Sequence, residues 1–208
     1  MILCIGDSFT YGEELSDTRN AWPNLLADSF YGVDVLNLGK SGASNDWIFT
    51  TAVERTVWER YDVIIVQWTE RGRVDLSICG ADIQGVNPST QRLNKVDKKW
   101  LDKYYKEFYD DNYAWQRTIT QIIALQNHFK RMEQPYVMTS MNTILEKRSM
   151  FYAVGGVLDT ETFLEPLTQM TYNCDKGPGG HPLEAGHQAI AKRMEKHLNE
   201  NFNLRITR

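Results

Sequence analysis

The sequence has few cysteines and no cluster of basic residues, and both absences narrow what the protein can be. Its three cysteines are odd in number and lack metal-ligand spacing, so we expect reduced thiols, no metal held by them and a cytoplasmic location. The 27 acidic residues outnumber the 23 basic ones. Because the lysines at 95–99 are followed at once by acidic residues, we expect no nucleic-acid partner and no anionic-membrane surface.

Long apolar runs are missing as well. No stretch approaches the roughly 18 residues that span a bilayer. The first five residues lack the charged region and cleavage site of a signal peptide, so we expect no membrane partner. What remains is an ordinary globular composition, with 42% hydrophobic and 24% charged residues in 208 positions. This length suits a single domain with a full core.

Apolar strands alternate with amphipathic helices at the start of the chain. Short apolar runs predict buried strands at 1–5, 33–38 and 63–68. Helical patterns at 20–30 and 44–60 lie between them. Because strand and helix alternate in this way, the sequence predicts an α/β fold whose parallel sheet is covered by helices on both faces.

The rest of the pattern adds fewer elements and two long segments. It predicts a helical stretch over about 98–132 with a break near residue 110, a strand at 135–140 and a last helix at 183–201. The segments 70–112 and 141–180 are expected to be insertions, and the polar 70–97 and irregular 141–180 stretches are candidates for a substrate lid. The aromatic residues between 100 and 115 could stack on sugar rings, although their helical spacing favours a packing role.

Gly6-Asp7-Ser8 follows directly after the first predicted strand. A serine in such a turn can expose its hydroxyl beside free backbone N–H groups, which would face developing negative charge. A phosphate-binding loop is the rival interpretation, but the turn has no lysine and carries Asp7 where an anion would sit. An ordinary turn is the third possibility.

Two further turns fall at the carboxyl edge of the predicted sheet, where ligands bind in such folds. After the second strand, the N–H of Gly42 is a candidate oxyanion donor and the Asn45 amide could add another, or Asn45 could simply cap the next helix. Near the C-terminus, His181 precedes Pro182 at a loop–helix junction. An imidazole with a pKa near ~6.5 is a natural base for a serine hydroxyl, whereas His187 suits a supporting or surface role.

In this order, these motifs resemble the SGNH, or GDSL-type, hydrolase family. The resemblance spans the chain through Gly6-Asp7-Ser8, Trp22-Pro23, Asn37 to Gly42, strand 63–68 and His181-Pro182 to His187. It implies a three-layer α/β/α, flavodoxin-like fold with about five parallel strands. It also implies ester hydrolysis without metal or cofactor, with Ser8 as nucleophile, His181 as base, and the N–H groups of Ser8 and Gly42 in the oxyanion hole.

Two positions depart from the family pattern. Arg71 falls about where an oxyanion asparagine is expected, so the third donor is Thr69, Arg71 or Asn45, or is missing. Arg71 could instead bind a substrate carboxylate or phosphate, or pair with Glu70 or Asp75. Pro178 stands where the family places the aspartate that orients the histidine. The group that orients His181 would then be Asp175 or a backbone carbonyl of the 174–180 loop, or there would be no such group.

The sequence therefore predicts an esterase or deacetylase that acts through Ser8 and His181 on a small acyl ester, with a carbohydrate acetyl ester as the expected substrate. An acyltransferase using the same residues is one alternative. A catalytically weak descendant that binds a glycan or a protein is another. Nothing in the sequence indicates the oligomeric state.

Overall fold

The computed structural model describes residues 1–30, 32–78, 81–87, 95–144 and 157–202. At its centre lies a sheet of four parallel strands in the order β2-β1-β3-β6. These strands are β1 (Ile2–Gly6), β2 (Val35–Gly39), β3 (Val63–Trp68) and β6 (Tyr136–Ser140). The predicted parallel sheet is confirmed, and each predicted strand lies within two residues of its observed position.

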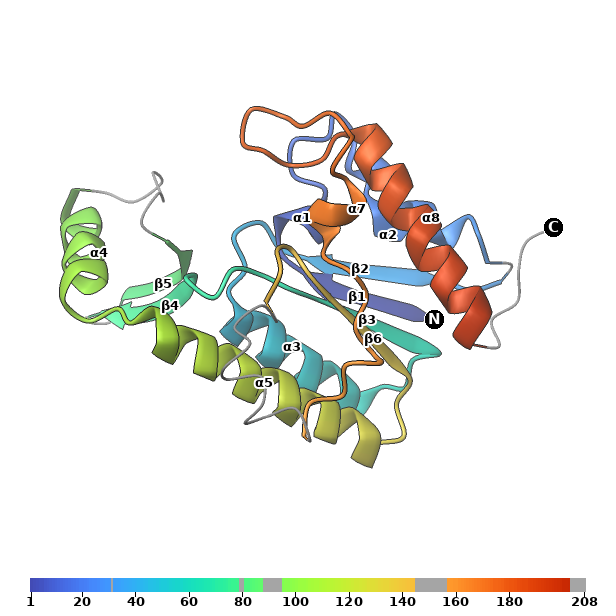
Figure 1. Ribbon diagram of the computed structural model, residues 1–208, viewed down its shortest axis with the longest axis horizontal. Helices are drawn as coiled ribbons and strands as arrows, with labels where there is room; N and C mark the ends of the chain where they lie inside the picture. The colour runs from blue at the N-terminus through green and yellow to red at the C-terminus, as the bar shows by residue number, and fades with distance from the viewer. Residues whose placement is uncertain (31, 79–80, 88–94, 145–156, 203–208) are drawn as a thin grey trace.

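Helices cover both faces of this sheet (Figure 1). On one face lie α3 (Asn45–Trp58) and α5 (Asp111–Arg131). The other face carries α2 (Trp22–Ala27) and α8 (Glu184–Asn201), with the short α1 (Ser8–Tyr11), α7 (Leu167–Met170) and the single turn η1 (Thr18–Asn20) near its edge. The three-layer α/β/α architecture is therefore as predicted.

The two central strands are buried on both faces, and successive side chains enter opposite cores. Leu3 and Ile64 pack with the α3 and α5 side, whereas Cys4 and Ile65 pack with the α2 and α8 side. This alternation is the period-two geometry of a strand. It explains why these strands appear in the sequence as unbroken apolar runs rather than as alternating patterns.

The expected fifth strand is reduced to a single bridge. Phe163 pairs in parallel with Met138 of β6, and the backbone of Met138 exchanges hydrogen bonds with Thr162 and Leu164. The segment occupies the position of a fifth strand beside β6. Because only this short stretch is extended, the irregular sequence after residue 141 gave no strand signal.

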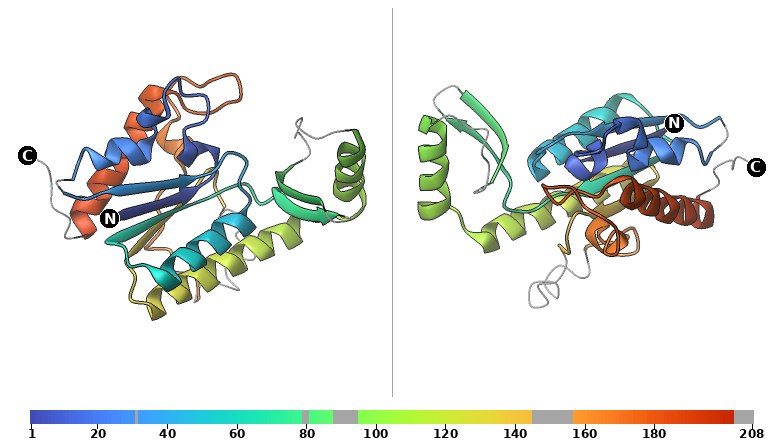
Figure 2. Two further views of the ribbon diagram at one scale, coloured as in Figure 1. Left: turned by 180° about the vertical axis from the view of Figure 1, so that it is seen from behind. Right: turned by 90° about the horizontal axis from the view of Figure 1, so that it is seen from above.

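A separate group of elements projects from the end of the sheet where α5 begins (Figures 1 and 2). It consists of the antiparallel hairpin β4 (Val74–Ile78) and β5 (Ala81–Val86), followed by α4 (Lys95–Glu107). Val74, Val86 and Leu101 form its small core. The sequence suggested a polar excursion over 70–97, whereas the structure builds a hairpin there. The predicted break near residue 110 is confirmed between α4 and α5.

Cys4 and Cys174 are free thiols, and Cys79 lies outside the described residues. Burial raises the pKa of the Cys4 thiol far above its ordinary value, so this side chain acts as a small apolar core residue. Among the helices that the structure describes, none is both long enough and apolar enough to cross a bilayer.

Candidate active site

Ser8 is held in a tight turn at the carboxyl end of β1. It is the first residue of α1, and Asp7 caps this helix by accepting a hydrogen bond from the N–H of Phe9 at 2.9 Å. Behind the turn, Gln67 of β3 accepts hydrogen bonds from the N–H of Asp7 and the hydroxyl of Thr10. A Cβ on Gly6 would lie 2.3 Å from that hydroxyl. The glycine of the motif is therefore required by close packing.

His181 reaches this serine from the opposite end of the chain. Its Nε2 lies 3.0 Å from Oγ of Ser8, although 173 residues separate them in sequence. Ser8 is 2% exposed and the side chain of His181 is 19% exposed. The predicted pair is brought within hydrogen-bond distance, which is the geometry that proton transfer from serine to imidazole needs.

The group behind the imidazole is Glu14, which sequence reasoning missed. Its Oε2 lies 2.9 Å from Nδ1 of His181 and also accepts the backbone N–H of His181 at 3.2 Å. Asp175 does not take this position, because its side chain is exposed while its backbone carbonyl binds Leu183. The expectation of Asp175 is corrected: the three side chains form the line Glu14, His181, Ser8.

Glu14 is suited to remain charged in this position. Partial burial alone would raise the pKa of Glu14, but hydrogen bonds from the N–H of Gly179 and from His181 outweigh it and lower the pKa below the ordinary value. Its backbone is left-handed, with φ of 67°. Such a conformation costs a non-glycine residue on the order of 1–3 kcal/mol and is concentrated at functional sites.

The loop that carries His181 is closed by its own backbone. Gly177 N–H donates to the carbonyl of His181 at 2.9 Å, and Leu183 N–H donates to the carbonyl of Asp175 at 3.2 Å. A Cβ on Gly177 would meet Oε2 of Glu14 at 2.6 Å. Glycine here lets the loop approach the carboxylate, so the glycine-rich sequence before His181 is part of how the triad is assembled.

The backbone amides of Ser8 and Gly42 are the candidate oxyanion donors. Ser8 N–H belongs to the first turn of α1, where helical N–H groups have no intrahelical acceptor. Gly42 lies after β2 with φ of 72°. Within the described part of the chain, neither amide donates to another group. Both sit at the carboxyl edge of adjacent strands and remain available for an anionic oxygen.

Asn45 and Thr69 are engaged with the protein rather than presented to a ligand. The Asn45 amide donates to the Thr69 carbonyl and to the Thr118 hydroxyl, and its oxygen accepts the N–H of Thr69. The Thr69 hydroxyl donates to Asp7 at 2.5 Å. Ser44, and not Asn45, caps α3. These contacts argue against either side chain as the third oxyanion donor and give both a supporting role.

Arg71 is paired with a carboxylate at the start of α5. Its Nε and Nη2 bind the two carboxylate oxygens of Asp111 at 2.8 and 3.0 Å, whereas the sequence suggested Glu70 or Asp75 as partners. The cation that contacts the residue before Ser8 is Arg73, whose Nη1 lies 3.4 Å from the buried carboxylate of Asp7. Arg73 thus balances the charge of the residue before Ser8.

The projecting hairpin supports the Gly42 turn. Asp75 of β4 accepts hydrogen bonds from the Ser44 hydroxyl at 2.7 Å and from the Gly85 N–H at 2.6 Å. Gly85 has φ of 58°, and a Cβ there would lie only 1.5 Å from the carbonyl oxygen of Gly42. No side chain fits between these two backbones. The hairpin therefore fixes the position of a candidate oxyanion amide.

Replacing Gly85 by alanine should displace the Gly42 turn and lower kcat for an activated acetyl ester by about 10²–10³-fold, the usual effect of losing one oxyanion donor. Gly32→Ala is the matched control, because Gly32 also has a positive φ (68°) but nothing within 4 Å of its Cβ position. The control should cost only about 1 kcal/mol of unfolding free energy. Equal kcat in the two variants would show that the hairpin does not position Gly42.

His187 is buried within the helical layer formed by α2 and α8 and links these two helices. It is fully buried, and its Nδ1 accepts the N–H of Trp22 at 3.1 Å, which joins α8 to the start of α2. Burial lowers the pKa of His187 to about 4. The predicted supporting role fits this geometry, and a surface position is excluded.

This buried imidazole predicts an acid-sensitive fold. Between pH 6.5 and about 4, the unfolded chain binds a proton at His187 that the folded chain does not. The unfolding free energy should therefore keep its full value above pH 6.5. It should fall by up to about 3 kcal/mol as the pH drops through this window. Urea denaturation at several pH values measures it. His187→Gln, which keeps an acceptor for Trp22, should flatten the dependence; an unchanged slope would contradict the assignment.

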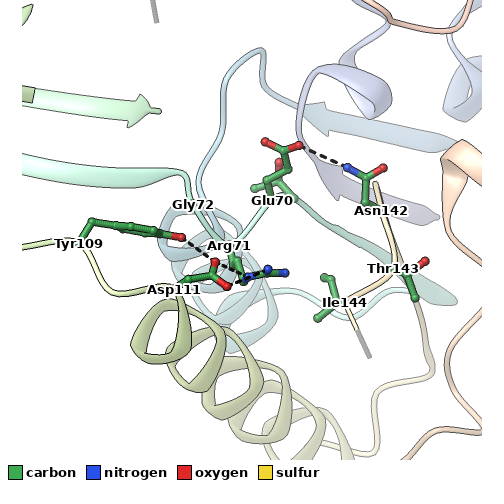
Figure 3. Close-up of a pocket in the computed structure, with 9 residues that line it drawn as sticks. Glu70, Arg71, Gly72, Tyr109, Asp111, Asn142, Thr143 and Ile144 are labelled. Carbon is green, nitrogen blue, oxygen red and sulfur yellow. Dashed lines mark hydrogen bonds and ion pairs between the residues drawn. The ribbon is translucent and has the colours of Figure 1, made fainter. Parts of the chain in front are cut away.

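A polar pocket of about 270 Å³ opens beside this site (Figure 3). It lies between the carboxyl ends of β3 and β6 and the start of α5. Thr69 lines it and also binds Asp7, so the pocket adjoins the turn that carries the nucleophile. The other lining residues are Glu70, Arg71, Gly72, Tyr109, Asp111, Asn142, Thr143 and Ile144. In the described part of the chain, no group of histidine, cysteine and acidic side chains could hold a metal ion.

Comparison with known proteins gives one family and a set of similar folds. The model of the GDSL-like lipase/acylhydrolase family matches residues 2–142. TesA shares 13% identity and a TM-score of 0.61, covering 96% of this chain and 98% of its own. Esterase EstA from Pseudoalteromonas sp. shares 11% identity and a TM-score of 0.60, covering 96% of each chain.

A two-domain esterase active on acetylated mannans also has a similar fold. It shares 13% identity and a TM-score of 0.53, and the match covers 96% of this chain and 49% of that protein. No curated protein matches in sequence. The similar structures support the three-layer fold, and the family match covers the strands that carry Ser8, Gly42 and Thr69.

Proposed function

The chain belongs to the GDSL-like lipase/acylhydrolase family, a family of ester hydrolases, and we propose that it is a serine esterase that removes a small acyl group, acetyl in the simplest case, from a carbohydrate hydroxyl. The observation that carries the proposal is the continuous line of contacts in which His181 lies 3.0 Å from Ser8 Oγ and 2.9 Å from Glu14. Nucleophile, base and orienting carboxylate are all within hydrogen-bond distance of their partners.

The first half of the reaction forms an acyl-enzyme. Ser8 Oγ attacks the ester carbonyl while His181 Nε2 takes its proton, and Glu14 holds the other ring nitrogen and stabilises the imidazolium. The carbonyl oxygen becomes an anion to which the N–H groups of Ser8 and Gly42 donate hydrogen bonds. When the tetrahedral intermediate collapses, the ester C–O bond breaks and His181 returns the proton to the leaving alcohol.

The second half restores the enzyme. A water molecule gives a proton to His181 and attacks the acyl carbonyl, and the Ser8–acyl bond then breaks as Oγ regains the proton. The products are a carboxylic acid and the free serine. An acyltransferase would differ only in replacing this water by a second alcohol, so product analysis with an added alcohol acceptor distinguishes the two.

Two observations support catalysis over binding alone. Gln67 holds the turn that carries Ser8 by accepting the N–H of Asp7. Glu14 contacts the His181 ring directly. Glu14 also supplies a carboxylate in place of the one that Pro178 removes from the family pattern. The carbohydrate part of the proposal is supported by the polar pocket beside the site and by the fold shared with an esterase active on acetylated mannans.

A direct test is turnover of acetylated carbohydrate compared with 4-nitrophenyl acetate. We expect release of acetate from a mixture of partially acetylated oligosaccharides, detected by an acetate assay, and no release with Ser8→Ala. Hydrolysis of 4-nitrophenyl acetate without any acetate from carbohydrate would retain the esterase and reject the carbohydrate substrate.

A further inference from the structure

The pocket that adjoins the turn before Ser8 through Thr69 has a charge arrangement that bears on which substrate it accepts. Among the described residues that line it, Arg71 is the one cation, and two of its three guanidinium nitrogens already bind Asp111. The Tyr109 hydroxyl also donates to Asp111 at 3.1 Å. This two-pronged pair balances the charge of the guanidinium and leaves only its remaining Nη hydrogens for another ligand.

A second carboxylate lies across the pocket. Glu70 accepts a hydrogen bond from the Asn142 amide at 3.3 Å, and both side chains are exposed (Figure 3). The described part of the lining therefore holds two carboxylates against one guanidinium. An anionic group that entered would meet net negative charge and a cation already paired with Asp111, and like charges placed side by side repel.

The same side chains suit neutral hydroxyl groups. Carboxylate oxygens accept hydrogen bonds from hydroxyls, the Asn142 amide donates and accepts, and the Thr143 hydroxyl does both. Ile144 adds an apolar wall, as in most sites where a few polar groups set orientation. The volume of about 270 Å³ is small for a ligand site, so it suits one ring rather than a long acyl chain.

We propose that this pocket binds the sugar ring of the ester, and that the Arg71–Asp111 pair makes it select neutral sugars over acidic ones. The inference rests on the proposed function and adds to it a location and a charge preference. Thr69 connects the pocket to the turn before Ser8, so a ring held there has its hydroxyls at the edge of the sheet where the nucleophile stands. Site groups that bind hydroxyls discriminate strongly against ligands that leave them unpaired.

The test compares matched pairs of substrates. Each pair is a mono-O-acetylated methyl hexoside and its hexuronide, in the glucose, galactose and mannose series, so that only a carboxylate replaces a hydroxymethyl group. We expect kcat/KM to favour the neutral member of the best pair by about tenfold or more. Preference for the acidic member, or hydrolysis of no pair by a protein that cleaves 4-nitrophenyl acetate through Ser8, would overturn the pocket assignment while leaving the esterase.

Two variants should move this preference in opposite directions. Asp111→Asn releases the Arg71 guanidinium, so the neutral-over-acidic ratio should fall about tenfold. Arg71→Gln removes the cation, so the ratio should rise. A ratio that stays constant in both variants would reject the role of the pair, and the opposite signs keep the test decisive if one variant folds poorly. If Ser8→Ala instead hydrolyses 4-nitrophenyl acetate like the parent, it is the proposed function itself that fails.

Discussion

Replacing Ser8 by alanine is expected to lower kcat/KM for 4-nitrophenyl acetate by about 10⁴-fold or more, the scale of losing a catalytic nucleophile. The reason is that no other described hydroxyl shares the environment of Ser8 Oγ, which is 3.0 Å from His181 Nε2 at the start of a helix. Steady-state kinetics measure the effect. The change removes a single oxygen from a residue that is 2% exposed, so the fold should persist.

Ser41→Ala is the matched control for this loss. Ser41 lies in the turn after β2, beside Gly42, and is exposed. Its removal takes away a hydroxyl at the same edge of the sheet without touching the contacts of His181. We expect its kcat/KM to stay within about threefold of the parent. Comparable activity of Ser8→Ala and Ser41→Ala would show that hydrolysis does not pass through Ser8.

Replacing Glu14 by glutamine is expected to lower kcat by about 10²–10⁴-fold with a smaller change in KM. The glutamine keeps the size of the side chain but removes the charge that stabilises the imidazolium, and its amide can bind the wrong tautomer of the ring. Glu14→Asp, which keeps the charge on a shorter side chain, should recover part of the activity. Stopped-flow or steady-state rates at saturating ester measure kcat directly.

Asp175→Asn is the control for Glu14→Gln, because Asp175 is an acidic residue of the histidine loop with an exposed side chain. It should leave kcat nearly unchanged. A catalytic effect of Glu14 should also move the acid limb of the kcat/KM profile to lower pH, since the imidazolium loses its anionic partner. A structural effect would lower activity at every pH alike. If Asp175→Asn proved the more damaging change, the assignment of Glu14 would be wrong.

The sheet could be predicted because its signal is local. The strands at β1 and β3 are continuous apolar runs, and the helices between them carry regular apolar faces. The hairpin over 74–86 was missed although β4 alternates Val74, Leu76 and Ile78 with polar residues. Such alternation is typical of a half-buried strand, but the Gly, Asn and Pro residues around it led to the interpretation of 70–97 as a polar excursion.

The site could be predicted only in part. Ser8 and His181 follow or precede recognisable turns, whereas Glu14 comes to His181 across 167 residues of sequence. No periodicity links such positions. The signals that were available are a carboxylate six residues after Ser8 and the glycines at 177, 179 and 180, which let a loop approach another group closely.

The partner of Arg71 could not be predicted from the sequence either. Its position after β3 made it a candidate for the oxyanion hole or for an anionic substrate, and a local partner at Glu70 or Asp75 was the simplest alternative. The structure gives it Asp111, at the start of α5 and 40 residues away. Side-chain direction at the end of a strand depends on which helix packs against it, and that packing is not encoded in the neighbouring residues.

The central claim is that Ser8 is a nucleophile activated by His181 and Glu14, and fluorophosphonate labelling followed by intact-mass and peptide mass spectrometry tests it most directly. The account predicts one phosphonyl group per chain, attached to Ser8, with labelling slowed at least about 100-fold in His181→Ala and also slowed in Glu14→Gln. An unlabelled chain, an adduct on another residue, or equal labelling rates in all three proteins would contradict it.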